Sequence, residues 1–191
     1  MRRLVLSVAA AIVGAVIAVP AFAEIDPLTR QPLLVDQEGF KPQATAIPRE
    51  TVTYNSKYAP GTILVDTRER RMYFVLSNTQ AIRYGVGVGR PGFEWSGTKA
   101  VTRKAEWPTW TPPAQMLRRR PDLPRFMPGG PENPMGARAL YLGSTLYRIH
   151  GSNEPETIGQ AVSSGCIRML NEDVIDLYER TKVGTRVVVL R

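Results

Sequence analysis

Residues 149–169 read IHGSNEPETIGQAVSSGCIRM, and this stretch decides how the rest of the chain is interpreted. It holds the only histidine, His150, and the only cysteine, Cys166, of the 191 residues. A nucleophilic thiol needs a base that removes its proton and donors that hold the oxyanion formed on attack. Small residues flank both side chains, and Gly165 permits the backbone conformations of an exposed turn beside the thiol. The stretch therefore predicts a site with Cys166 as nucleophile and His150 as base.

Three further side chains of this stretch are candidates for the same site. Arg168 lies two residues after Cys166, so in an extended chain it projects to the same side. There it could lower the pKa of the thiol or hold a carboxylate of a substrate. Ser163 and Ser164 precede the thiol and are candidate substrate contacts. The alternatives are a surface salt bridge for Arg168 and ordinary turn hydroxyls for the two serines.

A structural role for the lone thiol and the lone imidazole also has to be considered. A single cysteine is most often a buried, inert residue, and a single histidine is most often a surface or hydrogen-bonded structural residue. In an exported protein, however, a free thiol is at risk of oxidation, so an unpaired cysteine there indicates a reactive role. Composition and spacing thus leave open both a thiol enzyme of unspecified reaction and an inert cysteine.

Short β-prone segments dominate the chain after residue 53. The first three are separated by turn-forming residues at hairpin spacing, which predicts an antiparallel meander over residues 62–66, 72–76 and 82–88. Further strands are expected at residues 98–104, 140–142, 146–150 and 186–190. The pattern predicts one mainly-β domain over residues 53–191, with one or two short helices.

Residues 172–180 have the pattern of an amphipathic helix. Val174, Leu177 and Tyr178 fall on one side, and acidic residues occupy the first turn, where they suit the positive end of the helix. Asn171 is a suitable N-cap residue. We expect this helix to pack on the sheet.

Residues 107–134 contain eight prolines. Proline has no amide hydrogen to donate, so pairing in a strand ladder is difficult there. Trp110 begins the segment WTPP at residues 110–113, and an aromatic side chain held between prolines suits the edge of a peptide-binding groove. We therefore expect Trp110 to contact the substrate. The alternative is a rigid, packed loop.

The first residues have the pattern of an export signal. Two arginines are followed by an apolar run over residues 4–19 and by Ala-Phe-Ala at 21–23, which predicts a signal peptide over residues 1–23. The alternative is an uncleaved anchor, although the run is shorter than the roughly 20 residues of a spanning helix. Residues 24–52 show little apolar periodicity and are expected to form an extended arm or linker. The expected location is the periplasm, with no stable membrane span after cleavage.

The composition narrows the classes of partner and cofactor. The formal net charge is +8, but the run of arginines at 118–120 lacks the helical phase and interleaved aromatics of a nucleic-acid groove. An exported basic protein is instead expected to meet cell-wall polymers, lipid head groups or carboxylate-bearing peptides. One thiol and one imidazole fall short of the Cys and His ligands of a typical structural zinc site, and the single cysteine excludes an internal disulfide. No metal is expected.

The spacing of the motifs resembles a known family. The pattern of HG at 150–151 followed by SxGCIR at 163–168 is similar to the signature of the L,D-transpeptidase catalytic domain, the YkuD fold. The segments WTPP at 110–113 and NPMGARALYL at 133–142 resemble its ErfK/YbiS/YnhG-like branch. The likeness covers about residues 58–191.

The resemblance implies a peptidoglycan-modifying acyltransferase on a single β-sandwich domain, without a metal or organic cofactor. In that family the thiolate attacks the carbonyl of the third residue of a stem tetrapeptide, releases the terminal D-Ala and forms a thioester. An amine of a neighbouring stem peptide then resolves the thioester into a 3→3 cross-link. Some members attach a lipoprotein or an outer-membrane protein to the wall instead.

The resemblance also implies a role for each matching residue. Cys166 is the nucleophile and His150 the base, and the carbonyl of Gly151 orients the imidazole. The amides of Gly165 and Cys166 are the implied oxyanion donors. Arg168 is the implied substrate-positioning residue.

One position departs from the family pattern. Many relatives have a second histidine two places before the cysteine, where this chain has Ser164, so His150 must serve both half-reactions. Hydrolases of the same fold (L,D-carboxypeptidases or amidases) and a non-catalytic wall-binding domain are alternative functions. Papain-like and NlpC/P60-like peptidases place the cysteine before the histidine, which is the opposite of the order found here.

Overall fold

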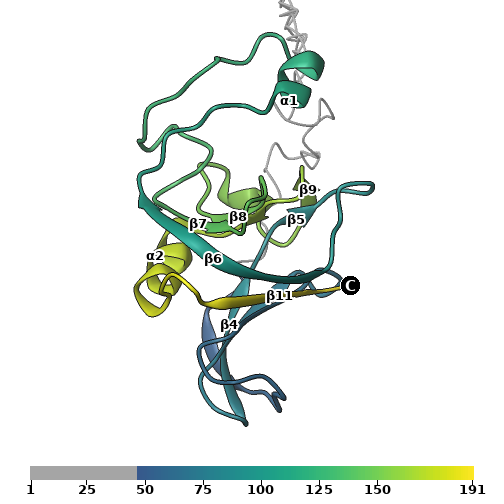
Figure 1. Ribbon diagram of the computed structural model, residues 1–191, viewed down its shortest axis with the longest axis vertical. Helices are drawn as coiled ribbons and strands as arrows, with labels where there is room; N and C mark the ends of the chain where they lie inside the picture. Colours follow the sequence, from purple (N-terminus) through teal and green to yellow (C-terminus); the bar gives the residue numbers. More distant parts are fainter. Residues whose placement is uncertain (1–46) are drawn as a thin grey trace, which may run out of the picture.

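A computed structural model of the protein describes residues 47–191 (Figure 1). Its elements in chain order are β1 (Glu50–Thr53), β2 (Ile63–Asp66), β3 (Arg71–Val75), β4 (Gln80–Gly85), β5 (Val88–Gly89), β6 (Gly97–Glu106), α1 (Ala114–Arg119), β7 (Arg138–Leu142), β8 (Arg148–His150), the 3-10 helix η1 (Pro155–Thr157), β9 (Ala161–Ser163), β10 (Ile167–Arg168), α2 (Asn171–Arg180) and β11 (Arg186–Leu190). The predicted signal peptide and most of the predicted arm lie outside the described residues. The fold is mainly β with two short α-helices, as predicted.

The first half of the main sheet is built from local hairpins. Strands β2, β3 and β4 pair with one another in sequence order, all antiparallel, which confirms the predicted meander. Strand β1 adds antiparallel to the outer edge of β4. The sheet therefore begins at Glu50, within the segment expected to be the arm and before the expected start of the domain at Thr53.

Strands β11 and β6 connect this half to the rest of the sheet. The full order is β1-β4-β3-β2-β11-β6-β7-β8-β10, with β11 parallel to β2 and antiparallel to β6. Residues 97–100 of β6 pair with β11, and its later residues pair with β7 (Figure 1). The register shifts between Val101 and Arg103, and an irregularity of this kind bends a strand. Strand β6 thus belongs to both halves.

The second half of the sheet consists of β7, β8 and β10. Strand β7 is antiparallel to β8, whereas β8 and β10 are parallel. Parallel neighbours need a crossover connection, and here η1 and β9 lie in it. The crossover returns the chain to the edge of β8 immediately after Cys166.

The core lies between the two halves, which confirms the predicted β-sandwich. Apolar side chains of both halves and of α2 meet in one buried cluster. Its larger members include Ile63, Met72, Phe74, Tyr84, Leu140, Leu142, Ile149, Ile167, Val174 and Leu177. Helix α2 closes this cluster with the apolar face that the sequence predicts.

Asn171 is not the N-cap of α2, and this prediction is wrong. The N-cap residue is Leu170, and no side chain caps the helix. The side-chain oxygen of Asn171 accepts a hydrogen bond from the amide of Ala137 at 2.9 Å, and its NH₂ group donates to the carbonyl of Ser152 at 3.0 Å. Tertiary partners therefore take the side chain, which ties α2 to the segments before β7 and after β8.

The strand expected at residues 82–88 is interrupted. Strand β4 ends at Gly85, and β5 leaves the main sheet to pair in parallel with β9. Between them, Gly87 exchanges two backbone hydrogen bonds of 2.9 Å with Arg168. A Cβ atom at Gly87 would lie 2.9 Å from the carbonyl oxygen of Thr157. The absence of a side chain thus lets this segment pass close to the crossover.

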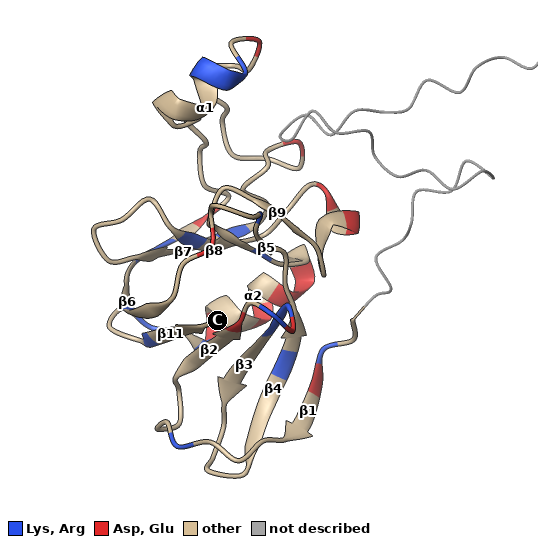
Figure 2. Ribbon diagram, turned by 90° about the vertical axis from the view of Figure 1, so that its right-hand side faces the viewer, with Lys and Arg blue, Asp and Glu red and all other residues tan. Residues whose placement is uncertain are grey.

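The proline-rich segment is an excursion between β6 and β7. No strand of the described chain lies within it, and its ladder pairing is limited to an isolated bridge between Trp110 and Met127. The short helix α1 fits between Pro113 and Pro121, and Figure 2 shows it standing beyond the sheets with basic residues in its last turn. No helix within residues 47–191 is long and apolar enough to cross a membrane.

Candidate active site

The parallel pair of β8 and β10 brings the predicted site together. His150 lies opposite Arg168, and Cys166 directly precedes β10 at the level of Arg148. Side chains alternate between the two faces of a strand. Ile149, between Arg148 and His150, and Ile167, between Cys166 and Arg168, are both buried in the core. Arg148, His150, Cys166 and Arg168 therefore share the other face.

These four side chains line a cavity of about 420 Å³, within the usual range for small-ligand sites. The other predicted site residues at the wall of this cavity are Ser163, Ser164 and Trp110. The remaining lining comes mainly from the proline-rich excursion and from the loop before β8, with Phe93, Pro113, Gln115, Met116, Arg119, Pro134, Met135, Thr145, Leu146 and Tyr147. The cavity thus lies between the second half of the sheet and the excursion that contains α1.

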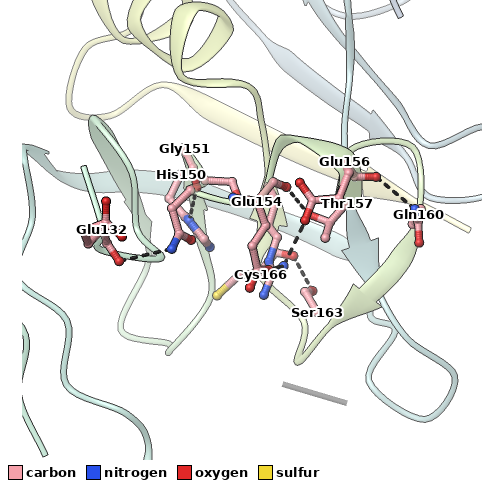
Figure 3. A network of polar contacts seen from close by, with 12 residues as sticks. Glu132, His150, Gly151, Glu154, Glu156, Thr157, Gln160, Ser163 and Cys166 are labelled. Atoms are coloured by element: carbon pink, nitrogen blue, oxygen red, sulfur yellow. Dashed lines mark hydrogen bonds and ion pairs between the residues drawn. The ribbon is translucent and has the colours of Figure 1, made fainter. Parts of the chain in front are cut away.

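The imidazole of His150 is buried and held by its own chain neighbour. Its Nδ1 lies 2.6 Å from the carbonyl oxygen of Gly151 (Figure 3). A carbonyl can only accept, so Nδ1 carries the hydrogen and Nε2 keeps its lone pair. Burial, followed by the charge of Arg168, lowers the pKa of His150 to about 3. The imidazole is therefore neutral at physiological pH and has the form of a base.

The thiol of Cys166 projects into the same space as the His150 ring (Figure 3). Its hydrogen bond in this structure goes to the carbonyl of Leu146 at 3.6 Å and not to the imidazole. Burial raises the pKa of the thiol, and the positive charges of Arg148 and Arg168 oppose that rise. Arg168 thus acts in the direction that the sequence suggests, but burial has the larger effect.

The turn that presents the thiol is held by Ser163. Its hydroxyl donates to the carbonyl of Cys166 at 2.6 Å and accepts from the amide of Gly165 at 3.1 Å. Gly165 has φ of +103°, and a Cβ atom there would lie 2.6 Å from the ring of Tyr147. The Gly165 amide is therefore already used inside the turn, so it is not aimed at a substrate as predicted. The Ser163 hydroxyl likewise serves the turn.

A tryptophan fixes the orientation of the peptide that precedes the thiol. Trp95 donates its Nε1 hydrogen to the carbonyl of Gly165 at 2.7 Å, and its ring stacks on Tyr147 with centroids 4.5 Å apart. In a trans peptide the C=O and N–H groups point in opposite directions, and the described chain has no cis bonds. The Cys166 amide therefore points away from Trp95, and of the predicted pair it is the Gly165 amide that Ser163 engages.

The guanidinium of Arg168 is committed to an ion pair. Its Nη1 lies 2.9 Å from Oε2 of Glu154 and 3.4 Å from the hydroxyl of Thr157. Only 5% of Arg168 is exposed. The surface salt bridge considered from the sequence is thus a buried one, and it joins β10 to the crossover beside η1.

Ser164 and Trp110 occupy different parts of the cavity wall. The Ser164 hydroxyl accepts a hydrogen bond from Nη1 of Arg90 at 3.3 Å. Trp110 is 8% exposed and exchanges two backbone hydrogen bonds with Met127. Trp110 is therefore both packed and at the cavity, so the two interpretations of its segment are not exclusive.

Metal ligands are not gathered at this site. Across residues 47–191, no group of three or more His, Cys, Asp and Glu side chains could hold a metal ion. The cysteine, histidine and arginine side chains at the wall of the cavity are those of Cys166, His150, Arg119, Arg148 and Arg168.

The family model for the L,D-transpeptidase catalytic domain, YkuD, matches residues 60–189. The chain belongs to this family. Among its relatives, the probable L,D-transpeptidase ErfK/SrfK of Escherichia coli K12 is 42% identical over 137 residues, which cover 67% of this chain and 43% of that protein. The probable L,D-transpeptidase YbiS of the same strain is 42% identical over 134 residues, covering 65% and 43%.

A solved structure shows the same fold. The L,D-transpeptidase from Mycobacterium smegmatis aligns with a TM-score of 0.55 at 16% identity, over 68% of this chain and 58% of that one. The matched regions span less than half the length of the two E. coli relatives.

Two residues of the candidate site, Arg148 and Trp95, were not predicted from the sequence. Arg148 lies two residues before His150 on β8. Because side chains alternate along a strand, this spacing places Arg148 on the same face as His150. Trp95 lies in an irregular segment before β6, and no spacing rule relates it to Gly165. Its role became visible only through its hydrogen bond.

Proposed function

We propose that this L,D-transpeptidase domain modifies peptidoglycan by acyl transfer through Cys166. The observation that carries the proposal is that the lone thiol and the lone imidazole line one cavity from neighbouring strands. The carbonyl of Gly151 keeps the imidazole hydrogen on Nδ1, so Nε2 is available as a base. An inert structural cysteine needs neither feature.

In the first half-reaction, Nε2 of His150 takes the thiol proton while Sγ of Cys166 attacks the third-residue carbonyl of a stem tetrapeptide. The carbonyl oxygen becomes an oxyanion, which the Cys166 amide holds. Collapse of the tetrahedral intermediate breaks the bond to D-Ala, whose nitrogen takes the proton from the imidazolium. The products are free D-Ala and a thioester on Cys166.

In the second half-reaction, the amine of an acceptor attacks the thioester. His150 takes the proton of the amine and returns it to the departing thiolate. An amine on a neighbouring stem peptide gives a 3→3 cross-link, and an amine on an outer-membrane protein gives attachment to the wall. Ser164 carries no base, so His150 serves both steps. We place this reaction in the periplasm, in line with the export signal predicted for residues 1–23.

The thiol and the imidazole are both uncharged in the resting site, which constrains the first step. The pKa of the thiol is raised and that of the imidazole is about 3, so neither group is charged at pH 7. Transfer of the thiol proton to Nε2 is therefore part of the first step. The thiol, which now contacts the carbonyl of Leu146, turns toward Nε2 when the donor enters.

The other cavity residues act on the donor peptide. Trp110 and Ser164 are proposed donor contacts, because both lie at the wall of the cavity. Arg168 is proposed to position the site through its ion pair with Glu154 and to favour the ionised thiol through its charge.

The test is incubation of the full chain with purified disaccharide-tetrapeptide, followed by mass analysis of the products. We expect a cross-linked dimer that lacks one D-Ala. Cys166→Ser is the matched control, since it changes one atom, and it is expected to give neither dimer nor thioester.

The remaining outcomes separate the alternatives. Tripeptide without dimer, again dependent on Cys166, would identify a hydrolase of the same fold. Intact tetrapeptide, with a folded protein, would identify a non-catalytic wall-binding domain and overturn the proposal.

A further inference from the structure

The Cys166 thiol stands at the end of a row of side chains that crosses the second half of the sheet. Arg103 of β6 lies opposite Tyr141 of β7, and Tyr141 lies opposite Arg148 of β8. The register of β8 and β10 places Cys166 beside Arg148. Both guanidinium carbons lie over the Tyr141 ring, at 3.6 Å from its centroid for Arg103 and 5.4 Å for Arg148. Arg148 thus occupies the position between the ring and the thiol.

Arg148 and Arg168 differ in their counter-charges. Arg168 pairs with Glu154 at 2.9 Å, whereas Arg148 makes no ion pair with any carboxylate of residues 47–191. Its Nε is buried without a hydrogen-bond partner in that part of the chain. A half-buried cation without a counter-charge is unfavourable unless an anion approaches it. The group beside Arg148 that can become an anion is the thiol.

The other charged groups around the thiol do not supply the same charge. His150 on β8 is neutral, because burial lowers its pKa to about 3. On β10, the charge of Arg168 is balanced by Glu154. Arg119 of α1 lines the cavity, but its guanidinium carbon lies over the ring of Phe93 at 5.6 Å.

One more cation approaches the turn itself. Arg90, which follows β5, donates to the hydroxyl of Ser164 at 3.3 Å and lies over the Phe93 ring at 4.2 Å. It reaches the turn through Ser164 rather than through the sulfur. Arg148 is therefore the cation best placed to act on Cys166 directly.

We propose that Arg148 is a catalytic residue of this domain, whose guanidinium stabilises the Cys166 thiolate as the proton moves to His150. The S–H bond breaks, the proton binds Nε2, and the negative sulfur is paired with Arg148. On attack the charge passes from sulfur to the carbonyl oxygen, so the ion pair is transient. The charge of Arg148 already opposes the rise in the pKa of the thiol.

This inference rests on the proposed role of Cys166 as nucleophile, but its test needs no acyl donor. Cys166 is the only thiol of the chain, so alkylation by iodoacetamide, which forms an S–C bond and releases iodide, reports on it alone. The rate is measured between pH 6 and 10.5 for the full chain and for Arg148→Gln. Arg103→Gln is the matched control, because it removes the same charge from the other side of Tyr141 and does not line the cavity.

We expect Arg148→Gln to move the alkylation profile to higher pH by about one unit. At pH 8 the rate then falls about three- to tenfold, because a less acidic thiolate is also more nucleophilic. Arg148→Lys keeps the charge and is expected to restore most of the rate. If Arg148→Gln does not fold, Arg148→Met, which keeps the packing on Tyr141, replaces it, and the same shift of the alkylation profile is expected.

An Arg148→Gln profile that overlies the original one overturns the proposal. So does an equal shift in Arg103→Gln, which would mean that the charge acts from a distance. A higher KM for the tetrapeptide with an unchanged alkylation profile would show that Arg148 binds a donor carboxylate instead. A failure of cross-linking in the earlier experiment leaves the alkylation result intact, so the two proposals fail separately.

Discussion

The two halves of the sheet use the same strand geometry for different ends. In the half formed by β1 to β4, each strand pairs with a neighbour through antiparallel hydrogen bonds, and the buried side chains of β2 and β3 are apolar. In the half formed by β7, β8 and β10, the last pair is parallel and is joined by a long crossover. One face of that pair enters the core, and the other carries His150 and three more polar side chains into the cavity.

The first half of the sheet mainly supplies stability, and the second half carries the candidate site. Changes in the first half remove core contacts and should alter the free energy of unfolding without altering the site. Changes on the cavity face of the second half should alter rates while most of the core remains intact. The following predictions test that separation, from the largest expected effect to the smallest.

His150→Ala should produce the largest loss. General-base catalysis contributes about 10²- to 10⁴-fold, and the chain has no second imidazole to replace His150. The rate of thioester formation with the tetrapeptide should therefore fall by that factor, nearly as completely as in Cys166→Ala. It is measured from the mass of the intact protein after rapid mixing near pH 7. Acylation of the alanine variant at a normal rate would refute the role of His150.

Ile63→Ala should act on stability alone. Ile63 is fully buried in the core and lies on β2, away from the cavity. Truncating such a side chain costs about 2–5 kcal/mol of unfolding free energy, and Ile63→Val, the graded control, about 0.5–1.5 kcal/mol. Urea unfolding measures both, alongside the acylation rate per folded molecule. A rate that falls in step with stability would show that the two halves are not separable.

Trp95→Phe should separate two reactions of the same sulfur. The variant keeps the ring stack on Tyr147 but loses the hydrogen bond to the Gly165 carbonyl that aims the Cys166 amide. We expect acylation by the tetrapeptide to slow by about 10- to 100-fold, somewhat less than when an oxyanion donor is removed outright. Alkylation by iodoacetamide forms no oxyanion and should not change.

The control for Trp95→Phe is Trp107→Phe. Trp107 is 44% exposed and does not line the cavity, so neither reaction should respond. If Trp95→Phe slows alkylation as much as acylation, the tryptophan positions the sulfur and not the amide.

Asp173→Asn should have the smallest effect, confined to one range of pH. Burial raises the pKa of Asp173 to about 6, with the charge of Arg49 opposing the rise. Its pKa is thus higher in the folded than in the unfolded chain, so its contribution to stability is present at low pH and is lost as the pH rises to about 6. Above that pH, the asparagine variant should be more stable than the original by about 1–2 kcal/mol.

Urea unfolding at pH 4 and pH 7.5 measures this difference, which should vanish at the lower pH. Glu172→Gln, which removes the neighbouring exposed carboxylate, is the control and should change little at either pH. An equal gain for Asp173→Asn at both pH values would mean that ionisation of Asp173 is not its cause.

Local patterns predicted much of the fold correctly. Residues 186–190 are a strand with the expected bounds, and the meander and α2 follow from hydrophobic periodicity and turn residues. The interruption at Gly87 was not predicted, because its cause is a close contact with Thr157 in a distant segment. Asn171 was misassigned for a similar reason, since its partners Ala137 and Ser152 come from other elements.

Some features of the candidate site could likewise be predicted from the sequence, whereas others depended on tertiary contacts. His150 and Cys166 could be chosen from the sequence because each is the single residue of its kind beside small neighbours. The sequence does not show whether the Gly165 amide is available as an oxyanion donor, because the Ser163 side chain could face either the substrate or the turn. Its hydroxyl turned inward and took that hydrogen bond. Strand alternation could have placed Arg148 at the site, but it could not show that Arg148 lacks a carboxylate partner among residues 47–191.

Residue type and spacing were enough to name the chemistry of this protein, because a thiol, an imidazole and flexible backbone beside them are properties of the chain itself. The state of those groups was decided by folding. A crossover chose which side chains lie opposite one another, burial made the imidazole neutral and the thiol less acidic, and a neighbouring hydroxyl took the hydrogen bond of the Gly165 amide. Strand pairing, burial and this hydrogen bond depend on which groups lie close together in the folded chain, and local residue patterns do not determine that.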